Sequence, residues 1–202
     1  MENLIHFDIE TFIRALGYMG IFAVVFAESG LLIGMFLPGD SLLFTAGLLA
    51  SLGVLNIWIL VPIIIIAAIT GDSVGYWLGS TLGPKIFNRE DSWLFNKKHA
   101  ERAEVFYQKY GAKAIIMARF VPIVRTLVPV VAGIGKMEYK KFFRFNVIGA
   151  LIWGISLPVL GFYLGKVIPN IDHYLLPITL GIIVVSFVPV VVEVWRGRKG
   201  RR

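Results

Sequence analysis

GIFAVVFAE at residues 20–28 and GAKAIIMAR at residues 111–119 are two versions of one element with opposite terminal charge. Each begins with Gly, continues through small and apolar residues, and ends eight positions later on Glu28 or on Arg119. Self-similar stretches of this kind indicate an internal repeat, and repeats interrupted by Pro and Gly mark transport sites in membrane proteins. The two stretches therefore predict a repeated membrane fold with ionisable residues at equivalent places.

A Pro-broken segment follows each copy of the element. FLPGDSL at 36–42 carries Asp40, and FVPIVRTLVP at 120–129 carries Arg125. Because Pro and Gly interrupt helices, each segment is predicted to form the tip of a helical hairpin. The predicted hairpin breaks are Pro38, Gly39, Pro122 and Pro129.

Small-residue motifs extend the repeat further along the chain. Ala-Gly pairs stand at 46–47 and 132–133, and 28 residues beyond each Gly the chain reads GYWLG (75–79) or GFYLG (161–165). Glycines in such motifs are more often helix-packing residues than ligand contacts. The predicted repeats cover about residues 2–80 and 93–166.

Composition favours a single membrane domain over residues 1–202. Hydrophobic residues make up 57% of the chain, charged residues only 16%, and the mean hydropathy is +0.76. A soluble domain carries about 25% charged residues. The apolar run 174–195 is predicted to be a C-terminal transmembrane helix, followed by a basic tail at 196–202. The acidic start of the chain lacks the basic region of a secretory signal, so the first apolar segment is expected to be retained.

The amino-acid composition limits which kinds of site and partner the chain can have. The absence of Cys excludes disulfides, thiolate metal sites and Cys nucleophiles, and no metal or cofactor is predicted. Five of the basic residues behind the net charge of +7 lie in the last seven positions, after the final apolar run. This placement favours a cytoplasmic anchor and speaks against a nucleic-acid partner.

The distribution of charge predicts the topology of the second repeat. With a cytoplasmic C-terminus, run 174–195 and run 145–165 both cross the membrane. If 112–135 were a full span, the basic loop 80–111 would lie outside, against the positive-inside rule. Each arm beside Pro122–Arg125 has about ten residues and reaches only about 15 Å, half of the roughly 30 Å hydrocarbon core. Residues 112–135 are therefore predicted to be a re-entrant hairpin.

The same reasoning applies to the first repeat. Residues 20–53 are predicted to form a hairpin with its tip at Pro38-Gly39-Asp40, although its first arm is longer and could nearly span. Run 57–79 then crosses from outside to inside, which leaves the N-terminus outside. With one crossing per repeat, the second copy is inverted and the hairpins enter from opposite faces. The predicted fold class is an all-α polytopic membrane protein built as an inverted repeat with two opposed re-entrant hairpins.

Two amphipathic stretches precede the hairpins. Apolar residues share one helical face in each stretch: Ile5, Ile9, Phe12, Ile13 and Leu16 in the first, and Ala100, Ala103, Phe106, Tyr107 and Tyr110 in the second. This pattern suits an interfacial helix lying on the bilayer, and equally a helix packed against the end of the protein itself.

Charged groups at membrane depth need a partner or water, because each costs roughly 2.5–3.5 kcal/mol at a helix centre. Glu28 and Asp40 are predicted to face Arg119 and Arg125 across the pseudo-two-fold axis. One interpretation is a pair of structural ion pairs; the favoured one is a substrate and proton site. Asp72, near the inner end of its crossing, is either a further site residue or a polar contact at a kink.

These residues also carry a family resemblance. Glu28, F-L-P-G-D at 36–40, G-D-S-V-G-Y at 71–76 and R-F-V-P-I-V-R at 119–125, followed by Ala132-Gly133, together resemble the DedA family, also called the SNARE-associated or VTT-domain family. The resemblance covers roughly residues 10–190. It implies two opposed re-entrant hairpins and lipid translocation, of undecaprenyl phosphate or of a phospholipid such as phosphatidylethanolamine, with a link to the proton motive force. It also implies that Glu28 with Asp40 and Arg119 with Arg125 are the family's important pairs.

The predicted mechanism assigns different roles to the acidic residues and to the arginines. Arg119 and Arg125 bind the phosphate of a lipid head group, because a guanidinium matches phosphate oxygens bidentately. Glu28 and Asp40 compete for the arginines in the empty site, and their protonation, favoured by desolvation, releases them. The predicted partners are the bilayer, a lipid substrate, and protons or sodium; a homo-oligomer is left open.

Three other classes are weighed against this one. An antiporter coupled to protons or another cation would use the same acids without a lipid. A membrane enzyme such as a lipid phosphatase is disfavoured, since His6, His99 and His173 lie outside the predicted hairpins and HExxH does not occur. A structural scaffold is a further alternative, but it does not explain why opposed charges occur in broken helices. The prediction is therefore a non-enzymatic multi-pass protein of the cytoplasmic membrane.

Overall fold

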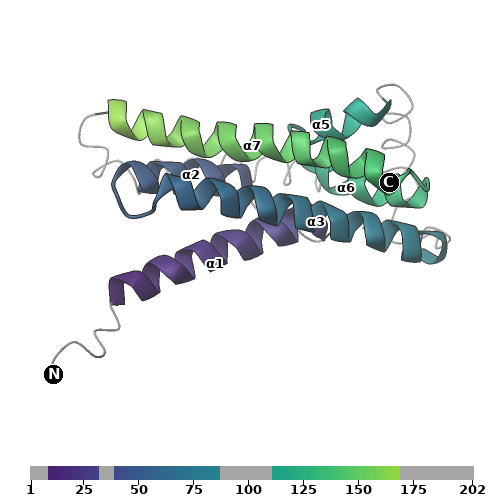
Figure 1. Cartoon of the computed structure of the whole chain (residues 1–202), viewed down its shortest axis with the longest axis horizontal. Coiled ribbons are helices and arrows are strands. Elements are labelled where there is room, and N and C mark those ends of the chain that lie inside the picture. Colours follow the sequence, from purple (N-terminus) through teal and green to yellow (C-terminus); the bar gives the residue numbers. More distant parts are fainter. Residues whose placement is uncertain (1–8, 32–38, 87–110, 169–202) are drawn as a thin grey trace, which may run out of the picture.

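A computed structural model describes residues 9–31, 39–86 and 111–168, and within these ranges every regular element is a helix (Figure 1). The predicted all-helical class is confirmed for this part of the chain. The helices, in chain order, are α1 Ile9–Gly30, α2 Gly39–Ser51, α3 Ile57–Ile86, the short 3-10 helix η2 Gly111–Lys113, α5 Ala114–Ala118, α6 Pro122–Ile134 and α7 Tyr139–Val167.

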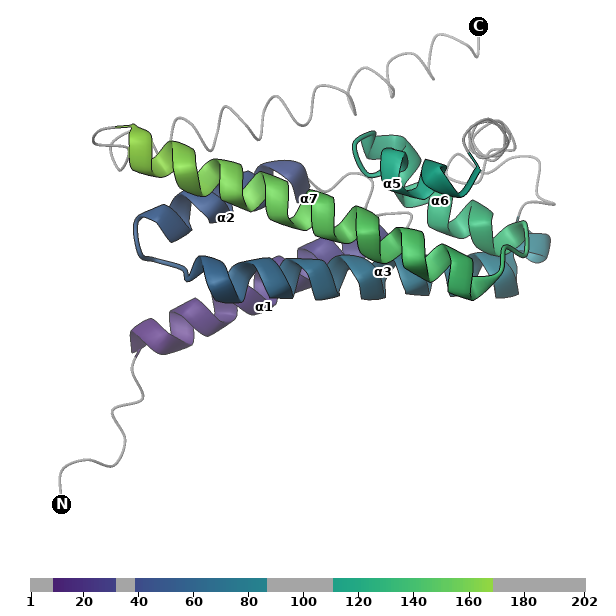
Figure 2. The same cartoon turned by 45° about the horizontal axis from the view of Figure 1, so that its top comes forward.

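Helices α3 and α7 form the long axis of the molecule. They pack on each other and run in opposite directions (Figures 1 and 2). Among the described residues, Ile57–Thr81 of α3 and Tyr139–Val167 of α7 are long and apolar enough to cross a membrane. At 1.5 Å per residue both exceed the roughly 30 Å hydrocarbon core. These two helices correspond to the crossings predicted from runs 57–79 and 145–165.

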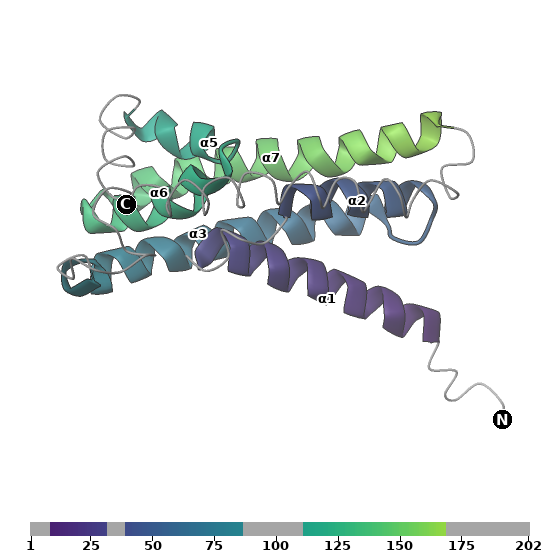
Figure 3. The ribbon, with the colours of Figure 1, turned by 180° about the vertical axis from the view of Figure 1, so that it is seen from behind.

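Two shorter helix pairs approach the middle of the molecule from opposite ends. Helix α1 runs inward from one end, and α2 starts near the middle and returns to that end (Figures 1 and 3). Helices α5 and α6 do the same from the other end. Within each pair the first helix packs on the long helix that follows it, α1 on α3 and α5 on α7. The second helix packs on the other long helix, α2 on α7 and α6 on α3.

Local chemistry explains where the inner helices start and end. Helix α2 begins at Gly39 with Asp40 in its first turn, where a negative charge is favourable to the helix dipole. Helix α6 begins at Pro122, whose fixed φ suits the first helical position. It ends in a two-bond cap, since Lys136 N–H donates to the Gly133 carbonyl (3.1 Å) and Met137 N–H to the Ala132 carbonyl (3.0 Å). These boundaries place both inner helix starts close to the centre of the bundle.

Reciprocal glycine contacts join α2 to α7. A Cβ atom added at Gly47 would lie 2.1 Å from the carbonyl oxygen of Pro158, and one added at Gly161 would lie 2.2 Å from the carbonyl oxygen of Phe44. Helix α2 therefore approaches α7 at backbone distance, which only glycine permits at both positions.

The α3 and α6 helices repeat this arrangement. Cβ atoms added at Gly133 and Gly79 would lie 2.1 and 2.0 Å from the carbonyl oxygens of Tyr76 and Val130. By its contact with a neighbouring backbone, Gly79 in α3 is the counterpart of Gly161 in α7. The repeated sequence motifs GYWLG and GFYLG instead align Gly161 with Gly75. Packing in the long helices is therefore one helical turn out of register with the sequence repeat.

We expect Gly47→Ala to destabilise the protein strongly, because the added methyl group would collide with the rigid backbone of α7. Overpacking typically costs about 1–3 kcal/mol, and more where the backbone itself must move. The measurement is the melting temperature of purified protein in detergent. Gly20→Ala is the matched control: nothing lies within 4 Å of the added Cβ, so its stability should be unchanged or slightly raised. Equal melting of both variants would contradict the close packing of α2 on α7.

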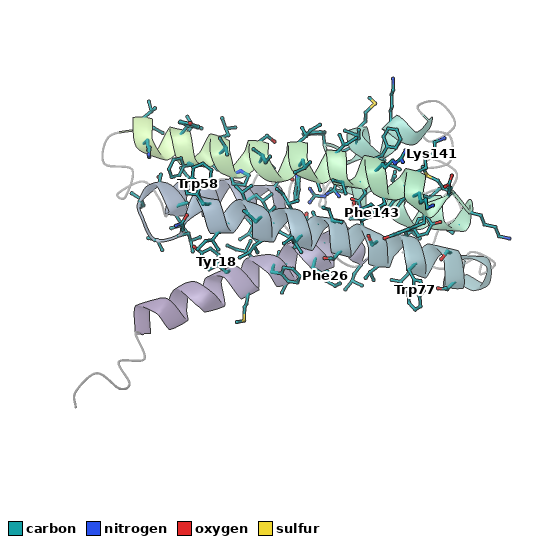
Figure 4. The ribbon with its side chains drawn as sticks, viewed as in Figure 1. Tyr18, Phe26, Trp58, Trp77, Lys141 and Phe143 are labelled. Carbon is teal, nitrogen blue, oxygen red and sulfur yellow. The ribbon has the colours of Figure 1, made fainter. Side chains whose placement is uncertain are left out.

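Large apolar side chains cover the outer faces of the long helices. Trp58 and Trp77 are exposed near opposite ends of α3 (Figure 4). At 1.5 Å per residue they are about 28 Å apart along the axis, close to the thickness of a hydrocarbon core. Trp is enriched at both membrane–water interfaces. The spacing fits a molecule whose long axis is aligned with the bilayer normal.

Two sequence predictions need correction here. Pro129 does not break its helix: α6 continues from Pro122 to Ile134, and the buried proline ring lies beside Gly75 of α3, where the missing side chain leaves room for it. From Ile9 onward the first amphipathic stretch does not form a helix of its own, because it is continuous with the apolar segment after it in α1 (Ile9–Gly30). Pro38, the second amphipathic stretch, run 174–195 and the basic tail lie outside the described residues.

Candidate functional site

Five charged side chains meet where the two helix pairs approach each other. They are Glu28 at the end of α1, Asp40 in the first turn of α2, Asp72 in α3, Arg119 between α5 and α6, and Arg125 near the start of α6. The breaks after Gly30 and after Ala118 put four of these residues close to helix ends. All five were singled out from the sequence, and the structure brings them together.

Arg125 contacts both acids of the first helix pair. Its Nη1 donates to Asp40 Oδ1 at 2.7 Å, and its Nη2 forms an ion pair with Glu28 Oε1. The backbone N–H of Gly39 also donates to Glu28 Oε1, at 3.1 Å. A Cβ atom at position 39 would overlap the Glu28 carboxylate, so a larger residue there would displace this side chain from its present contacts. Arg125 is thus the ionic link between the two helix pairs.

Arg119 turns to the long helices instead. Its Nη2 forms an ion pair with Asp72 of α3 and donates to Asn146 Oδ1 of α7. Asn146 Nδ2 in turn donates to the carbonyl of Ile69 at 3.2 Å. The sequence predicted that Glu28 and Asp40 would be shared between the two arginines. Both acids face Arg125, and Asp72 is the acid that faces Arg119.

Trp153 of α7 connects the two arginine clusters. Its ring centroid lies 5.1 Å from the guanidinium carbon of Arg125 and 5.9 Å from that of Arg119. Its indole Nε1–H donates to Asp40 Oδ1 at 2.8 Å. A cation over an indole face gains about 0.5–2 kcal/mol, the higher value when it is desolvated. One buried side chain therefore touches both arginines and one acid.

Burial sets the electrostatics of the site. Glu28, Asp72, Arg119 and Arg125 are all less than a tenth exposed, whereas the Asp40 side chain is 41% exposed. Among the described residues, Glu28 Oε2 and the Nε atoms of both arginines are buried without a hydrogen-bond partner. Unsatisfied polar atoms at a charged centre mark places for water or a ligand. The site therefore combines anion-binding groups, competing carboxylates and one partly open side.

Comparison with known proteins identifies the family. The VTT domain matches residues 37–163, a range that contains Asp40, Asp72, both arginines and Trp153. The chain belongs to the DedA family. Protein DedA of Escherichia coli (strain K12) is 46% identical over 184 residues, covering 90% of this chain and 84% of that protein. Inner membrane protein YqjA of Escherichia coli (strain K12) is 32% identical over 200 residues, covering 92% and 87%.

A third relative is named as a membrane protein. An uncharacterised membrane protein of Mycobacterium leprae (strain TN) is 38% identical over 192 residues, covering 95% of this chain and 86% of that protein. No solved structure matches the chain. Family membership and the two long apolar helices together describe a DedA-family membrane protein.

Two site residues of this DedA-family chain were missed by sequence reasoning. Asn146 is a lone amide in an apolar run, and a buried amide is costly unless it is hydrogen-bonded, so it offered a usable signal. Trp153 offered none, because an aromatic residue in an apolar helix is ordinarily a packing residue. Only the fold shows that its ring faces two guanidinium groups.

Asp72→Asn is expected to lower stability clearly, and to lower the transport predicted from the sequence only in part. The amide keeps the size of the carboxylate, but it leaves the buried Arg119 without its ion-pair partner. Removing one member of a buried pair costs about 3–5 kcal/mol. Melting temperature and transport per folded molecule measure the two effects separately. Normal stability and normal transport would show that the Arg119–Asp72 contact is dispensable.

Proposed function

We propose that this DedA-family protein moves a phosphate-bearing lipid head group across the cytoplasmic membrane. The observation that carries the proposal is the pair of buried guanidinium groups close to the ring of Trp153, at the meeting point of the two helix pairs. Planar guanidinium groups bind phosphate oxygens bidentately, and buried ones do so with little competition from water. Undecaprenyl phosphate or a phospholipid such as phosphatidylethanolamine would present the required group.

The proposed placement in the membrane follows from the helix arrangement. We place the α1–α2 pair as a re-entrant hairpin entering from outside, and the α5–α6 pair as one entering from the cytoplasm. Lys136, Lys140, Lys141 and Arg144 then lie on the cytoplasmic side, as the positive-inside rule requires. The reciprocal packing of α2 on α7 and of α6 on α3 supports an inverted repeat. In this placement the five charged residues lie near the bilayer midplane.

In the proposed mechanism, carboxylates and phosphate compete for the arginines. In the empty site Glu28 and Asp40 neutralise Arg125. Protonation of these acids weakens their hold, so that the phosphate of a lipid can replace them. The lipid tail stays in the bilayer while the head group passes between the hairpins. Rocking of one repeat against the other opens the site alternately to each side.

Lipid translocation in proteoliposomes tests this function. The purified protein is reconstituted with labelled phosphatidylethanolamine, phosphatidylglycerol or undecaprenyl phosphate, and head-group exposure is followed with and without a proton gradient. We expect faster translocation of at least one phosphate-bearing lipid than in protein-free vesicles. Absence of translocation for every lipid in the panel would contradict the proposal.

A cation-coupled antiporter is the second candidate, favoured by the charge count of the site. Three acids stand against two arginines, so the ionised cluster carries a formal excess of negative charge that a proton or sodium ion could neutralise. Direct ion-flux measurement in vesicles of neutral lipid separates the two functions. Robust flux without any phosphate-bearing lipid substrate would favour the antiporter.

A further inference from the structure

The two arginines of the site are held in different ways. Arg119 belongs to a closed chain of contacts that begins and ends on α3: Asp72 pairs with Arg119, Arg119 donates to Asn146, and Asn146 donates to Ile69. Both ends of the Asn146 amide are used in this chain. Displacing Asp72 from Arg119 would therefore disturb the contact between the long helices. We therefore expect Arg119 to keep its contacts with Asp72 and Asn146.

The two acidic partners of Arg125, Glu28 and Asp40, each have a second hydrogen-bond donor and can be released more easily. Glu28 keeps the backbone N–H of Gly39 when Arg125 turns away, and Asp40 keeps the indole N–H of Trp153. Each acid therefore has a second hydrogen-bond donor already in place. This matters because a carboxylate left without any partner is strongly destabilising at a low-dielectric site. Asp40 is also the exposed member of the cluster, so the exchange can begin at the open side.

We propose that Trp153 is the positioning residue of this exchange: its indole N–H holds Asp40 while a phosphate group takes the place of that carboxylate on Arg125, and its ring keeps Arg119 apart as a fixed charge. This inference rests on the proposed function and narrows it, because it makes Arg125 the arginine that changes partner. Arg119 contributes its charge to the site without leaving Asp72.

The geometry also defines the chemical class of the incoming group. Arg125 uses separate Nη atoms for its two carboxylate partners. Two oxygens of a single phosphate can occupy both Nη atoms at once in a bidentate pair. A lipid head group and a free phosphate share this chemistry, so the experiment must distinguish them.

The test is a double-mutant cycle on binding by the full-length protein in detergent. The probes are farnesyl phosphate and inorganic phosphate, and affinity is measured by calorimetry. Trp153→Phe keeps a ring beside the arginines but loses the N–H, and we expect it to weaken farnesyl phosphate binding by about tenfold, the size of one hydrogen bond to a charged group. Asp40→Asn removes the competing charge and should tighten binding. In that background, Trp153→Phe should change the affinity by less than about twofold.

Non-additivity is the readout that a purely structural tryptophan would not produce. Trp77→Phe, on the exposed face of α3, is the matched control and should bind like the parent. Equal weakening by Trp153→Phe in both backgrounds would overturn the inference. So would unchanged binding in both. If Trp153→Phe does not fold, a tenfold loss in Arg125→Lys with less than a threefold loss in Arg119→Lys, per folded molecule, supports the inference, and the reverse order overturns it.

Failure of the proposed function looks different. A parent protein that binds neither probe contradicts the phosphate site itself, and the inference falls with it. A parent that binds inorganic phosphate as tightly as farnesyl phosphate, with the expected non-additivity, supports the exchange on Arg125 but counts against a lipid as its occupant.

Discussion

Arg125→Ala is expected to reduce lipid translocation by more than about a hundredfold, the largest effect of any single substitution in the site. Arg125 forms ion pairs with both acids of the first helix pair, and in the proposed mechanism it is the group on which phosphate replaces these carboxylates. Its removal takes away the anion-binding guanidinium and leaves Glu28 and Asp40 uncompensated. Losing one partner of a buried pair costs about 3–5 kcal/mol, and a free energy of that size corresponds to about two to three and a half orders of magnitude in an equilibrium constant.

Two companion variants separate a binding defect from a folding defect. Arg125→Lys keeps the positive charge but loses the bidentate fork. If charge alone held the head group, this variant would bind like the parent protein; we expect it to bind head groups more weakly. Combining Arg125→Gln with Glu28→Gln and Asp40→Asn neutralises Arg125 and both of its acidic partners and should restore the melting temperature. This triple variant should still fail to transport. Wild-type translocation by a stable protein without these three charges would show that these residues only hold the fold together.

The charge-swapped protein Glu28→Arg with Arg125→Glu, made in an Asp40→Asn background, is expected to fold and yet to be inactive. Because Asp40→Asn removes the carboxylate that would otherwise face the new acid at position 125, the swap keeps one opposite-charge contact across the two helix pairs, and a structural ion pair survives it. A transport site of the proposed kind does not, because the phosphate-binding group would then lie on α1 and the released acid on α6. Translocation should fall to the level of protein-free vesicles, while the melting temperature stays within a few degrees of the Asp40→Asn parent.

The choice of partner makes the swap specific. Glu28 and Arg119 carry the opposite charges of the two repeated elements, but Arg119 pairs with Asp72. Swapping Glu28 with Arg119 would therefore break two contacts and should destabilise the protein more than swapping Glu28 with Arg125. Full activity of the Glu28–Arg125 swap would tell against the transport role of both residues.

The sequence predicted the elements of this site better than their partners. The repeated element, the Pro-Gly segments and the charges in apolar sequence are local signals, and two of the predicted breaks, Gly39 and Pro122, are residues at which a helix begins. Pairing is not local. The face that a helix such as α3 presents depends on its rotation against its neighbours, and helical periodicity alone does not fix the rotation of a helix that is apolar on every side. Asp72 could therefore not be assigned to Arg119 from its position in the chain.

Two other features lie beyond sequence reasoning for a similar reason. Trp153 belongs to the site because of where α7 crosses both helix pairs, a tertiary property without a motif. Pro129 was expected to break a helix, but a proline within a buried helix is accommodated when a neighbouring glycine leaves space, as Gly75 does here. The one-turn offset between Gly79 and Gly161 in their packing likewise follows from helix contacts and not from the spacing of the repeat.

We propose that two hairpins enter from opposite faces and meet near the midplane, and cysteine-accessibility labelling distinguishes this placement from a full crossing by residues 112–135. The chain contains no Cys, so single Lys98→Cys, Lys140→Cys and Val54→Cys variants report without background. Along the chain, position 98 precedes the α5–α6 pair and position 140 follows it, whereas position 54 lies in the turn between α2 and α3. We expect a membrane-impermeant reagent to label 98 and 140 only from the cytoplasmic side and 54 only from outside. Labelling of 98 and 140 from opposite sides would make residues 112–135 a full crossing and contradict the account.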